Sequence, residues 1–155
     1  MDVICHVITK LELGGAQEVA MRVVSSLDRR RFRPVLLAGP GGLLTEEAHA
    51  LDGVEVRVIP SLVRDIHPAQ DLRALWELVA TFRRLQPKIV HTHSSKAGIL
   101  GRLAAWLAGV PCIVHTVHGY GVTPAQPSWL RHMLIGLERI VGRVTTHWIA
   151  VSQAD

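Results

Sequence analysis

Three segments of this sequence bring glycine, serine and histidine together at spacings that suit the binding of a polar ligand. Residues 9–17 contain the pair Gly14-Gly15, residues 91–98 read His-Thr-His-Ser-Ser-Lys-Ala-Gly, and residues 115–121 read His-Thr-Val-His-Gly-Tyr-Gly. Each lies at the end of a short apolar run that is typical of a buried strand. Ligands bind beyond the carboxyl ends of the strands in an open parallel sheet. We therefore expect the three segments to line one polar cleft.

The glycines Gly14 and Gly15 stand directly before a helical pattern of apolar residues. Glycine lets the backbone approach a ligand closely, and a helix N-terminus offers unpaired N–H groups and a positive dipole end. This arrangement suits a phosphate or pyrophosphate. The segment is neither G-x-G-x-x-G nor a P-loop with its lysine, however. Spacing alone therefore favours an ordinary strand-to-helix turn over an anion site.

His91 and His93 are two residues apart in a predicted strand, so their side chains point to the same side. They could form a metal-binding pair, but no third ligand stands at a usable spacing. We expect His91 to be a hydrogen-bonded core residue, and His93, nearer the strand end, to be more open to function. Ser94 or Ser95 is expected to cap the next helix, or to bind ligand hydroxyls.

His118 is expected to end the next strand, immediately before Gly119, where a side chain can reach a bound ligand. A histidine there can donate a hydrogen bond or act as a general base. Anchoring of the loop is an equally good interpretation. Arg64, in residues 60–68, is a candidate phosphate contact because guanidinium geometry matches phosphate oxygens. A plain exposed arginine is the alternative there.

Short apolar runs alternate with helical patterns along the whole chain. We predict strands at residues 3–8, 33–38, 54–58, 88–92, 112–117 and 148–151, with helical stripes between them. Strand–helix alternation with short connections predicts an α/β fold, a doubly wound and mainly parallel sheet with Rossmann-like topology. Val54, Val56 and Val58 alternate with charged residues, which places their strand near an edge.

The composition describes one soluble-type domain over residues 1–155. The chain is 48% hydrophobic and 19% charged, which excludes a disordered chain, and its net charge of +4 suits either a phosphate-bearing partner or a merely solvated surface. Cys5 and Cys112 lie in apolar runs without a C-x-x-C pair, as in proteins of a reducing cytoplasm. We expect no signal peptide and no membrane-spanning helix. Because the chain stops just after a strand, we expect a fragment.

Residues 129–144 form an amphipathic helical pattern with one basic face. Leu130, Met133, Leu134, Leu137 and Val141 are expected to be buried. The opposite face carries Arg131, Arg139 and Arg143. Such a face can rest on an anionic membrane, although most faces of this kind are simply solvated.

Taken together, the loops resemble the N-terminal domain of family 4 glycosyltransferases, which are retaining enzymes of the GT-B fold. The resemblance rests on the order of residues 14–17, 90–98, 115–119 and 149–152, and residues 91–98 are its most specific part. Residues 62–68 are also similar to the subgroup that builds capsular polysaccharides, exopolysaccharides and lipid-linked glycans in bacteria.

The resemblance implies roles for individual residues. Gly14 and Gly15 would approach the donor diphosphate, and His118 would lie beside the transferred sugar. The acceptor or sugar side would be lined by His93, Ser94, Ser95, Lys96, Gly119 and Arg64. The donor would be a nucleotide-sugar, usually a UDP-sugar, and the acceptor lipid-linked or polysaccharide. No metal, other cofactor or nucleic acid is expected.

The resemblance also implies that half of a catalytic unit is missing. The donor-binding C-terminal domain of the family, with its paired glutamates, does not occur in these residues. We expect no appreciable transfer by this chain without that domain, supplied in cis or by a partner chain. We expect a cytoplasmic location. A peripheral position at the inner face of the cell membrane is a hypothesis that rests on the basic helix and the lipid-linked acceptor.

Two other functions compete with this interpretation. The chain could be a non-catalytic sugar-nucleotide-binding or partner module that pairs with a separate donor-binding chain. It could also be a generic nucleotide-binding domain, such as part of a sugar-nucleotide epimerase, although residues 91–96 argue against that interpretation.

Overall fold

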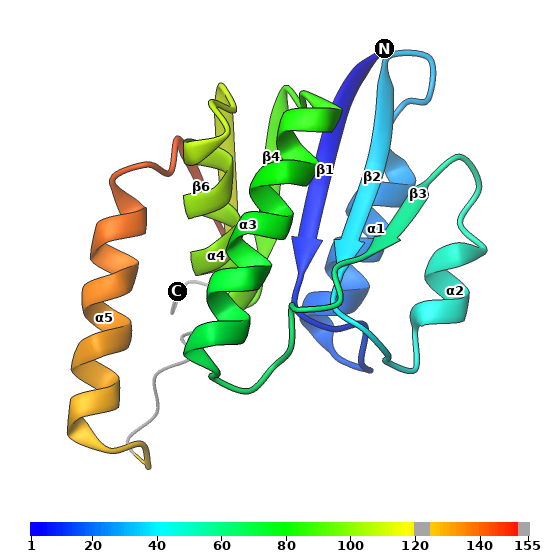
Figure 1. The fold of residues 1–155 in the computed structure, drawn as a ribbon. Helices are drawn as coiled ribbons and strands as arrows, with labels where there is room; N and C mark the ends of the chain where they lie inside the picture. The colour runs from blue at the N-terminus through cyan, green and yellow to red at the C-terminus, as the bar shows by residue number, and fades with distance from the viewer. Residues whose placement is uncertain (120–124, 152–155) are drawn as a thin grey trace.

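A computed structural model describes residues 1–119 and 125–151 as one twisted parallel sheet flanked by helices (Figure 1). The strands are β1 Asp2–Ile8, β2 Phe32–Ala38, β3 Glu55–Val58, β4 Ile89–His93, β5 Cys112–Val117 and β6 His147–Ala150. The helices are α1 Gly15–Ser26, α2 Thr45–His49, α3 Pro68–Leu85, α4 Ser95–Leu107 and α5 Ser128–Gly142. The strand order β3-β2-β1-β4-β5-β6 confirms the predicted doubly wound, Rossmann-like α/β fold.

The sequence pattern of each strand matches its place in the sheet. β1 is central and buried from Ile4 to Ile8, as a strand covered on both faces must be. β3 lies at the edge, as its alternating pattern predicted, and Glu55 there pairs with Arg57 and, at 2.5 Å, with Arg33 of β2.

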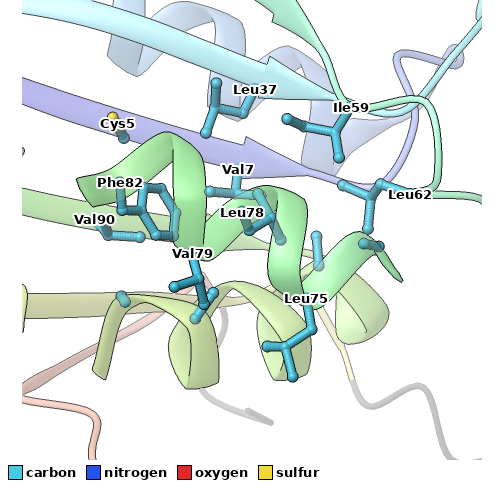
Figure 2. Packing of buried hydrophobic residues seen from close by; sticks show 14 of the residues in the cluster. Cys5, Val7, Leu37, Ile59, Leu62, Leu75, Leu78, Val79, Phe82 and Val90 are labelled. Carbon is cyan, nitrogen blue, oxygen red and sulfur yellow. The ribbon is translucent and has the colours of Figure 1, made fainter. Parts of the chain in front are cut away.

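The hydrophobic core has two parts, one on each face of the sheet. Helices α3 and α4 cover one face, where Val35 and Leu37 of β2 and Phe82 of α3 belong to the larger cluster (Figure 2). Leu36 and Ala38, the alternate residues of β2, pack on the opposite face with α1. The period of two along a strand explains this division.

The two cysteines lie within the sheet, as predicted, but they differ in burial. Cys5 is fully buried in the larger cluster, and burial raises the pKa of its thiol to about 12. A thiol in this setting stays protonated and behaves as a small apolar side chain. Cys112 is only partly buried.

Helix α5 is much less buried than the sequence pattern predicted. Of the five apolar residues expected inside, only Val141 is buried, whereas Met133 and Leu137 are 39% and 36% exposed. The helix lies at the end of the sheet, beyond α4 (Figure 1), so a single neighbouring helix covers little of its apolar face.

One buried arginine holds α5 against α4. Arg102 is 0% exposed, and its Nη2 pairs with Glu138 Oε2 of α5 at 2.6 Å. Its Nε donates to the carbonyl oxygen of Gly98, and its guanidinium lies 5.1 Å from the ring of Trp148 in β6. Because the charge of Arg102 is buried, removal of Glu138 would leave a costly unpaired charge.

Candidate active site

A cavity of ≈ 620 Å³ opens at the carboxyl ends of β5 and β6, between α4 and α5. Its walls combine strand ends with residues of both helices. They include Ser94, Ser95, Ile99, His115, Thr116, His118, Gly119, Glu138, Arg139 and Trp148. The structure thus brings four of the predicted site residues, two serines, a histidine and a glycine, to one cavity at the expected edge of the sheet.

His118 lies one residue beyond the end of β5, not within it as predicted. It is half-buried and contributes to the cavity wall beside Gly119. Gly119 has a φ of +96°, a conformation that a residue with a side chain rarely adopts. The turn therefore leaves His118 at the mouth of the sheet, where a side chain can meet a ligand.

The predicted glycine pair opens helix α1, with Gly14 at the N-cap and Gly15 as the first helical residue. The backbone of Gly14 is extended, with a φ of 172°, which any residue can adopt. A Cβ at Gly15 would meet no atom within 4 Å, and a Cβ at Gly14 would meet only the flexible end of Gln17. Packing within the described residues therefore does not require glycine at either position.

Thr9 and Ser94 tie the glycine loop to the loop after β4. Their hydroxyl oxygens lie 2.8 Å apart, and the backbone N–H of Ala97 donates to Thr9 Oγ1 at 3.1 Å. Thr9 therefore caps helix α4 from a distant segment of the chain. The expectation that Ser94 or Ser95 would cap α4 is wrong, because neither side chain bonds to that helix start and Ser94 faces Thr9 instead.

Ser94 also has a strained backbone, with φ 65° and ψ 160°. Residues with side chains avoid this region, at a cost of about 1–3 kcal/mol, and such strain gathers at functional sites. The strain positions the Ser94 hydroxyl between Thr9 and the cavity.

His93 is completely buried, although it stands nearer the strand end than His91. Its Nε2 lies 3.2 Å from Nδ1 of His6, and its Nδ1 lies 3.2 Å from Nε2 of His118. Burial lowers the pKa of His93 far below its usual value and lowers that of His6 to about 3. Both rings are therefore neutral. The hydrogen bond between His93 and His118 connects them to the cavity wall.

His91 is the hydrogen-bonded core residue that the sequence predicted. It is 7% exposed, its Nε2 lies 2.6 Å from Thr116 Oγ1, and burial lowers its pKa to about 4. The strand pairing places His6 directly opposite His91. This neighbour was not foreseen, because only the order of β1 and β4 in the sheet brings the two residues together.

The structure supplies the third metal-ligating side chain that the sequence spacing lacked. Ring nitrogens of His6, His91 and His93 lie within 4.8 Å of one another. Three neutral imidazoles at such distances are a set that a transition metal can use. Here both nitrogens of His93 already take part in hydrogen bonds to other histidines, which leaves that ring no lone pair for an ion.

His115 is a site residue that sequence reasoning passed over. It is 5% exposed, its Nδ1 lies 2.8 Å from Thr92 Oγ1, and its ring meets Trp148 edge-on at 5.5 Å. Burial lowers its pKa to about 3. It stands two residues after the buried Ile113 in β5, so the period of two along a strand could have indicated that it faces inward.

Of the described residues predicted for the site, five do not belong to the cavity wall: Gly14, Gly15, His93, Lys96 and Arg64. Lys96 Nζ pairs with Asp71 Oδ1 of α3 at 2.5 Å and also bonds to the carbonyl oxygen of Asp65. It therefore fastens α4 to the loop before α3. Arg64 lies in that same loop and is exposed.

The basic residues of α5 divide between the cavity and the surface. Arg139 belongs to the cavity wall, whereas Arg143 follows the end of the helix and is exposed. Trp129 and Ile140 on this helix are 68% and 59% exposed. In residues 1–119 and 125–151, none of the helices combines the length and apolar character needed to cross a bilayer.

Solved structures share the fold of this chain. MurG of Acinetobacter baumannii superposes with a TM-score of 0.69 at 16% identity, covering 97% of this chain and 41% of that one. Anabaena HepE, solved in complex with UDP and glucose, gives a TM-score of 0.67 at 21% identity, covering 97% and 38%. At these identities the likeness shows the fold, which is one half of GT-B architecture.

Two characterised relatives are similar in sequence. An Escherichia coli UDP-Gal:alpha-D-GlcNAc-diphosphoundecaprenol alpha-1,3-galactosyltransferase is 36% identical over 98% of this chain and 39% of its own length. The Staphylococcus aureus capsular polysaccharide biosynthesis glycosyltransferase CapM is 29% identical over 70% and 28%. The chain thus spans well under half of the relatives it matches. The model of the glycosyl transferase 4-like domain matches residues 14–155, and this chain therefore belongs to that glycosyltransferase family.

Proposed function

We propose that this chain is the acceptor-side domain of a retaining glycosyltransferase. The enzyme moves a sugar from a nucleotide-diphosphate donor, a UDP-sugar, to a lipid-linked or polysaccharide acceptor. The anomeric carbon exchanges its bond to the diphosphate oxygen for a bond to an acceptor hydroxyl oxygen, and the hydroxyl proton passes to the departing nucleotide diphosphate. The observation that carries the proposal is the cavity at the strand ends, with His118 in its wall. The open helix start at Gly14-Gly15 supports it, because the loop before it hydrogen-bonds through Thr9 to Ser94 of the cavity wall.

The glycine loop supports the donor side of this proposal. The start of α1 presents backbone N–H groups and a positive dipole end that suit a diphosphate. The absence of described atoms within 4 Å of a Cβ at Gly15 leaves room for a ligand at the backbone, which a side chain would block. We assign Gly14 and Gly15 to the donor diphosphate on this basis.

The cavity supports the sugar and acceptor side. His118 and Gly119 stand at one wall and Ser94 and Ser95 at another, so imidazole and hydroxyl groups face the same space. Such groups exchange hydrogen bonds with sugar hydroxyls without a bound metal. We assign these residues to the sugar and acceptor side, and we propose the same for Lys96, Arg64 and His93, which lie outside the cavity wall. We also propose that the transfer needs no metal or cofactor.

The relatives support the class of both substrates. The Escherichia coli protein is named for a UDP-galactose donor and a diphosphoundecaprenol-linked acceptor, and the Staphylococcus aureus protein for capsular polysaccharide biosynthesis. We therefore propose a nucleotide-sugar donor and a polyprenyl-diphosphate or polysaccharide acceptor for the enzyme that contains this chain. Its donor-binding half would come from further residues in cis or from a partner chain.

The test replaces His118 in the complete enzyme. The His118→Ala variant should lose turnover by roughly 100-fold or more, as expected for a group that acts at the reacting sugar, while its thermal unfolding stays close to wild type. Exposed His49→Gln is the matched control and should keep full activity. Unchanged turnover in His118→Ala would contradict the assignment.

A second test concerns the chain by itself. The isolated residues 1–155 should release no UDP from a UDP-sugar in the presence of acceptor, and addition of the donor-binding half should restore release. Turnover of a UDP-sugar by the isolated chain would contradict the requirement for a second half.

We also propose that α5 rests on the inner face of an anionic membrane. Arg131, Arg139 and Arg143 supply positive charge, and the exposed Trp129 and Ile140 supply apolar surface on the same helix. Co-sedimentation with vesicles containing anionic lipid at low salt should retain the wild-type chain, and a triple Arg→Gln variant should bind more weakly. Equal sedimentation with neutral and anionic vesicles would show that the positive charges of α5 do not contribute to membrane binding.

A further inference from the structure

A line of three histidines runs from the centre of the sheet to the cavity. His6 of β1 and His93 of β4 are buried, and His118 follows β5 in the cavity wall. His6 Nδ1 lies 3.2 Å from His93 Nε2, and His93 Nδ1 lies 3.2 Å from His118 Nε2. The middle ring thus uses both nitrogens, one for each neighbour.

The chemistry of neutral imidazole couples the three rings. A neutral ring has one N–H donor and one acceptor nitrogen, so it can donate at one end and must accept at the other. Burial keeps His6 and His93 in this neutral state, because it lowers the pKa of both rings. If His6 donates to His93, then His93 must donate to His118. The reverse order is the only other arrangement that satisfies both bonds.

The two arrangements place the proton of His118 on different nitrogens. In the first, His118 accepts at Nε2 and carries its proton on Nδ1, which makes Nδ1 a donor. In the second, His118 donates from Nε2, and Nδ1 is an acceptor. All three rings carry the proton on Nδ1 in the first arrangement and on Nε2 in the second. The tautomer of a side chain two rings away is therefore coupled to the tautomer of His118.

We propose that His6 and His93 are positioning residues that lock the tautomer and orientation of His118 through this hydrogen-bonded line. The inference rests on the proposed role of His118 in sugar transfer, but the coupling itself is a property of this chain. A metal ion bound by His6, His91 and His93 is the competing explanation for the buried histidines. Such an ion would break the hydrogen-bonded line at His93.

Nitrogen-15 NMR of the 155-residue chain tests the coupling without any substrate. His6, His93 and His118 should share one tautomer, all Nδ1–H or all Nε2–H. The His6→Leu variant should change the tautomer populations of His118. His6→Asn, whose amide can stand at the place of Nδ1, should restore a single tautomer. A mismatched set of tautomers in the wild-type chain would overturn the proposal.

His91→Leu is the matched control. His91 is buried like its neighbours and its ring lies 4.2 Å from that of His93, but its hydrogen bond goes to Thr116. This variant should disturb packing yet keep a single tautomer at His118. Loss of the single tautomer in His91→Leu as well would show a packing effect and overturn the relay. Zinc retained by the wild-type chain, with histidine shifts that change on chelation, would overturn it in favour of a metal site.

Activity of the complete enzyme gives a separate result. His6→Leu should lower kcat roughly tenfold or more with little change in the KM for the donor, and His6→Asn should recover much of the loss, as seen for groups that orient a functional histidine. An enzyme without transferase activity would refute the proposed function but leave the NMR result standing. Coupled tautomers with an unchanged kcat in His6→Leu would overturn the positioning role.

Discussion

The loops that follow β1 and β2 lie at the same edge of the sheet, and both contain glycines, but for different reasons. A Cβ at Gly39, after β2, would lie 1.8 Å from the carbonyl oxygen of Leu62 and 2.4 Å from that of Thr9. Gly42 has a φ of +112°, and a Cβ there would lie 2.3 Å from the carbonyl oxygen of Leu11. After β1, a Cβ at Gly15 would meet nothing within 4 Å.

The difference separates glycines that the fold requires from glycines that the packing of the described residues does not explain and that we assign to a ligand. Gly39 and Gly42 let three backbone segments pack together, so the folded chain itself explains them. Gly14 and Gly15 have no such explanation within the described residues, because a Cβ at either position would meet at most a flexible side chain. Glycines of the first kind should affect stability, and glycines of the second kind should affect only binding and turnover.

The buried histidines, like Gly39 and Gly42, contribute to the fold itself. We expect the largest effect on the free energy of unfolding when acid protonates them. Unfolded histidines take up protons near pH 6.5, whereas His91 in the folded chain does so at about pH 4 and His6 and His115 at about pH 3, because burial lowers the pKa of each ring. The free energy of unfolding should reach its highest value above pH 6.5. It should fall as the pH is lowered toward 4, by roughly 1.4 kcal/mol per pH unit for each ring.

Urea unfolding at pH 7, 6 and 5 measures this loss. The exposed His49→Gln variant should show the same pH dependence as wild type, and His115→Gln a weaker one. Equal unfolding free energies at pH 7 and pH 5 would show that protonation of the buried histidines does not destabilise the fold.

Gly39→Ala should be the most damaging single substitution of a glycine at this edge. Two carbonyl oxygens closer than any real contact force the backbone apart, and we expect a loss of about 3 kcal/mol or more, the size of effects with a named steric cause. Chemical denaturation measures it. A Gly39→Ala chain as stable as wild type would remove the basis for the contrast between the two loops.

Ser94 tests backbone strain at the same edge. Ser94→Ala removes the hydrogen bond to Thr9 and keeps the strained backbone, whereas Ser94→Gly removes the same bond and relieves the strain. The glycine variant should therefore be the more stable of the two, by about 1–2 kcal/mol. If the alanine variant unfolds at the same urea concentration or later, the backbone of Ser94 is not strained in solution.

Gly15→Ala should have the smallest effect on stability and a clear effect on function. Alanine is acceptable in the first turn of a helix, so the free energy of unfolding should change by less than about 1 kcal/mol. In the complete enzyme, the added methyl group should weaken donor binding roughly tenfold or more, because it occupies the space assigned to the diphosphate. Unchanged donor affinity in the Gly15→Ala enzyme would show that the donor diphosphate does not lie against this glycine.

Much of the fold could be predicted from the residues alone. The strands and helices follow from apolar runs and helical periodicity, and the edge position of β3 follows from Val56 alternating with Glu55 and Arg57. The burial of α5 was misjudged because an amphipathic pattern shows which face is apolar but not how much of it a neighbour covers. Of the five residues expected inside, only Val141 finds such cover.

The candidate site could be predicted only in part. Gly14-Gly15, Ser94-Ser95 and His118 could be placed at one edge, because strand ends of a parallel sheet converge there. The partners of these residues could not, since they come from other strands and loops: Thr9 reaches Ser94 across 85 positions of the chain, and His6 reaches His93 across 87.

The sequence by itself determined the class of fold, the edge that carries the site and the family to which the chain belongs, because periodicity and local motifs are properties of neighbouring residues. Only the tertiary structure decided which glycines are packed and which face open space, and it alone joined His6, His93 and His118 into one line. The physical reason is that strand order brings distant residues into contact. Hydrogen bonds and steric exclusion depend on that contact, not on position along the chain.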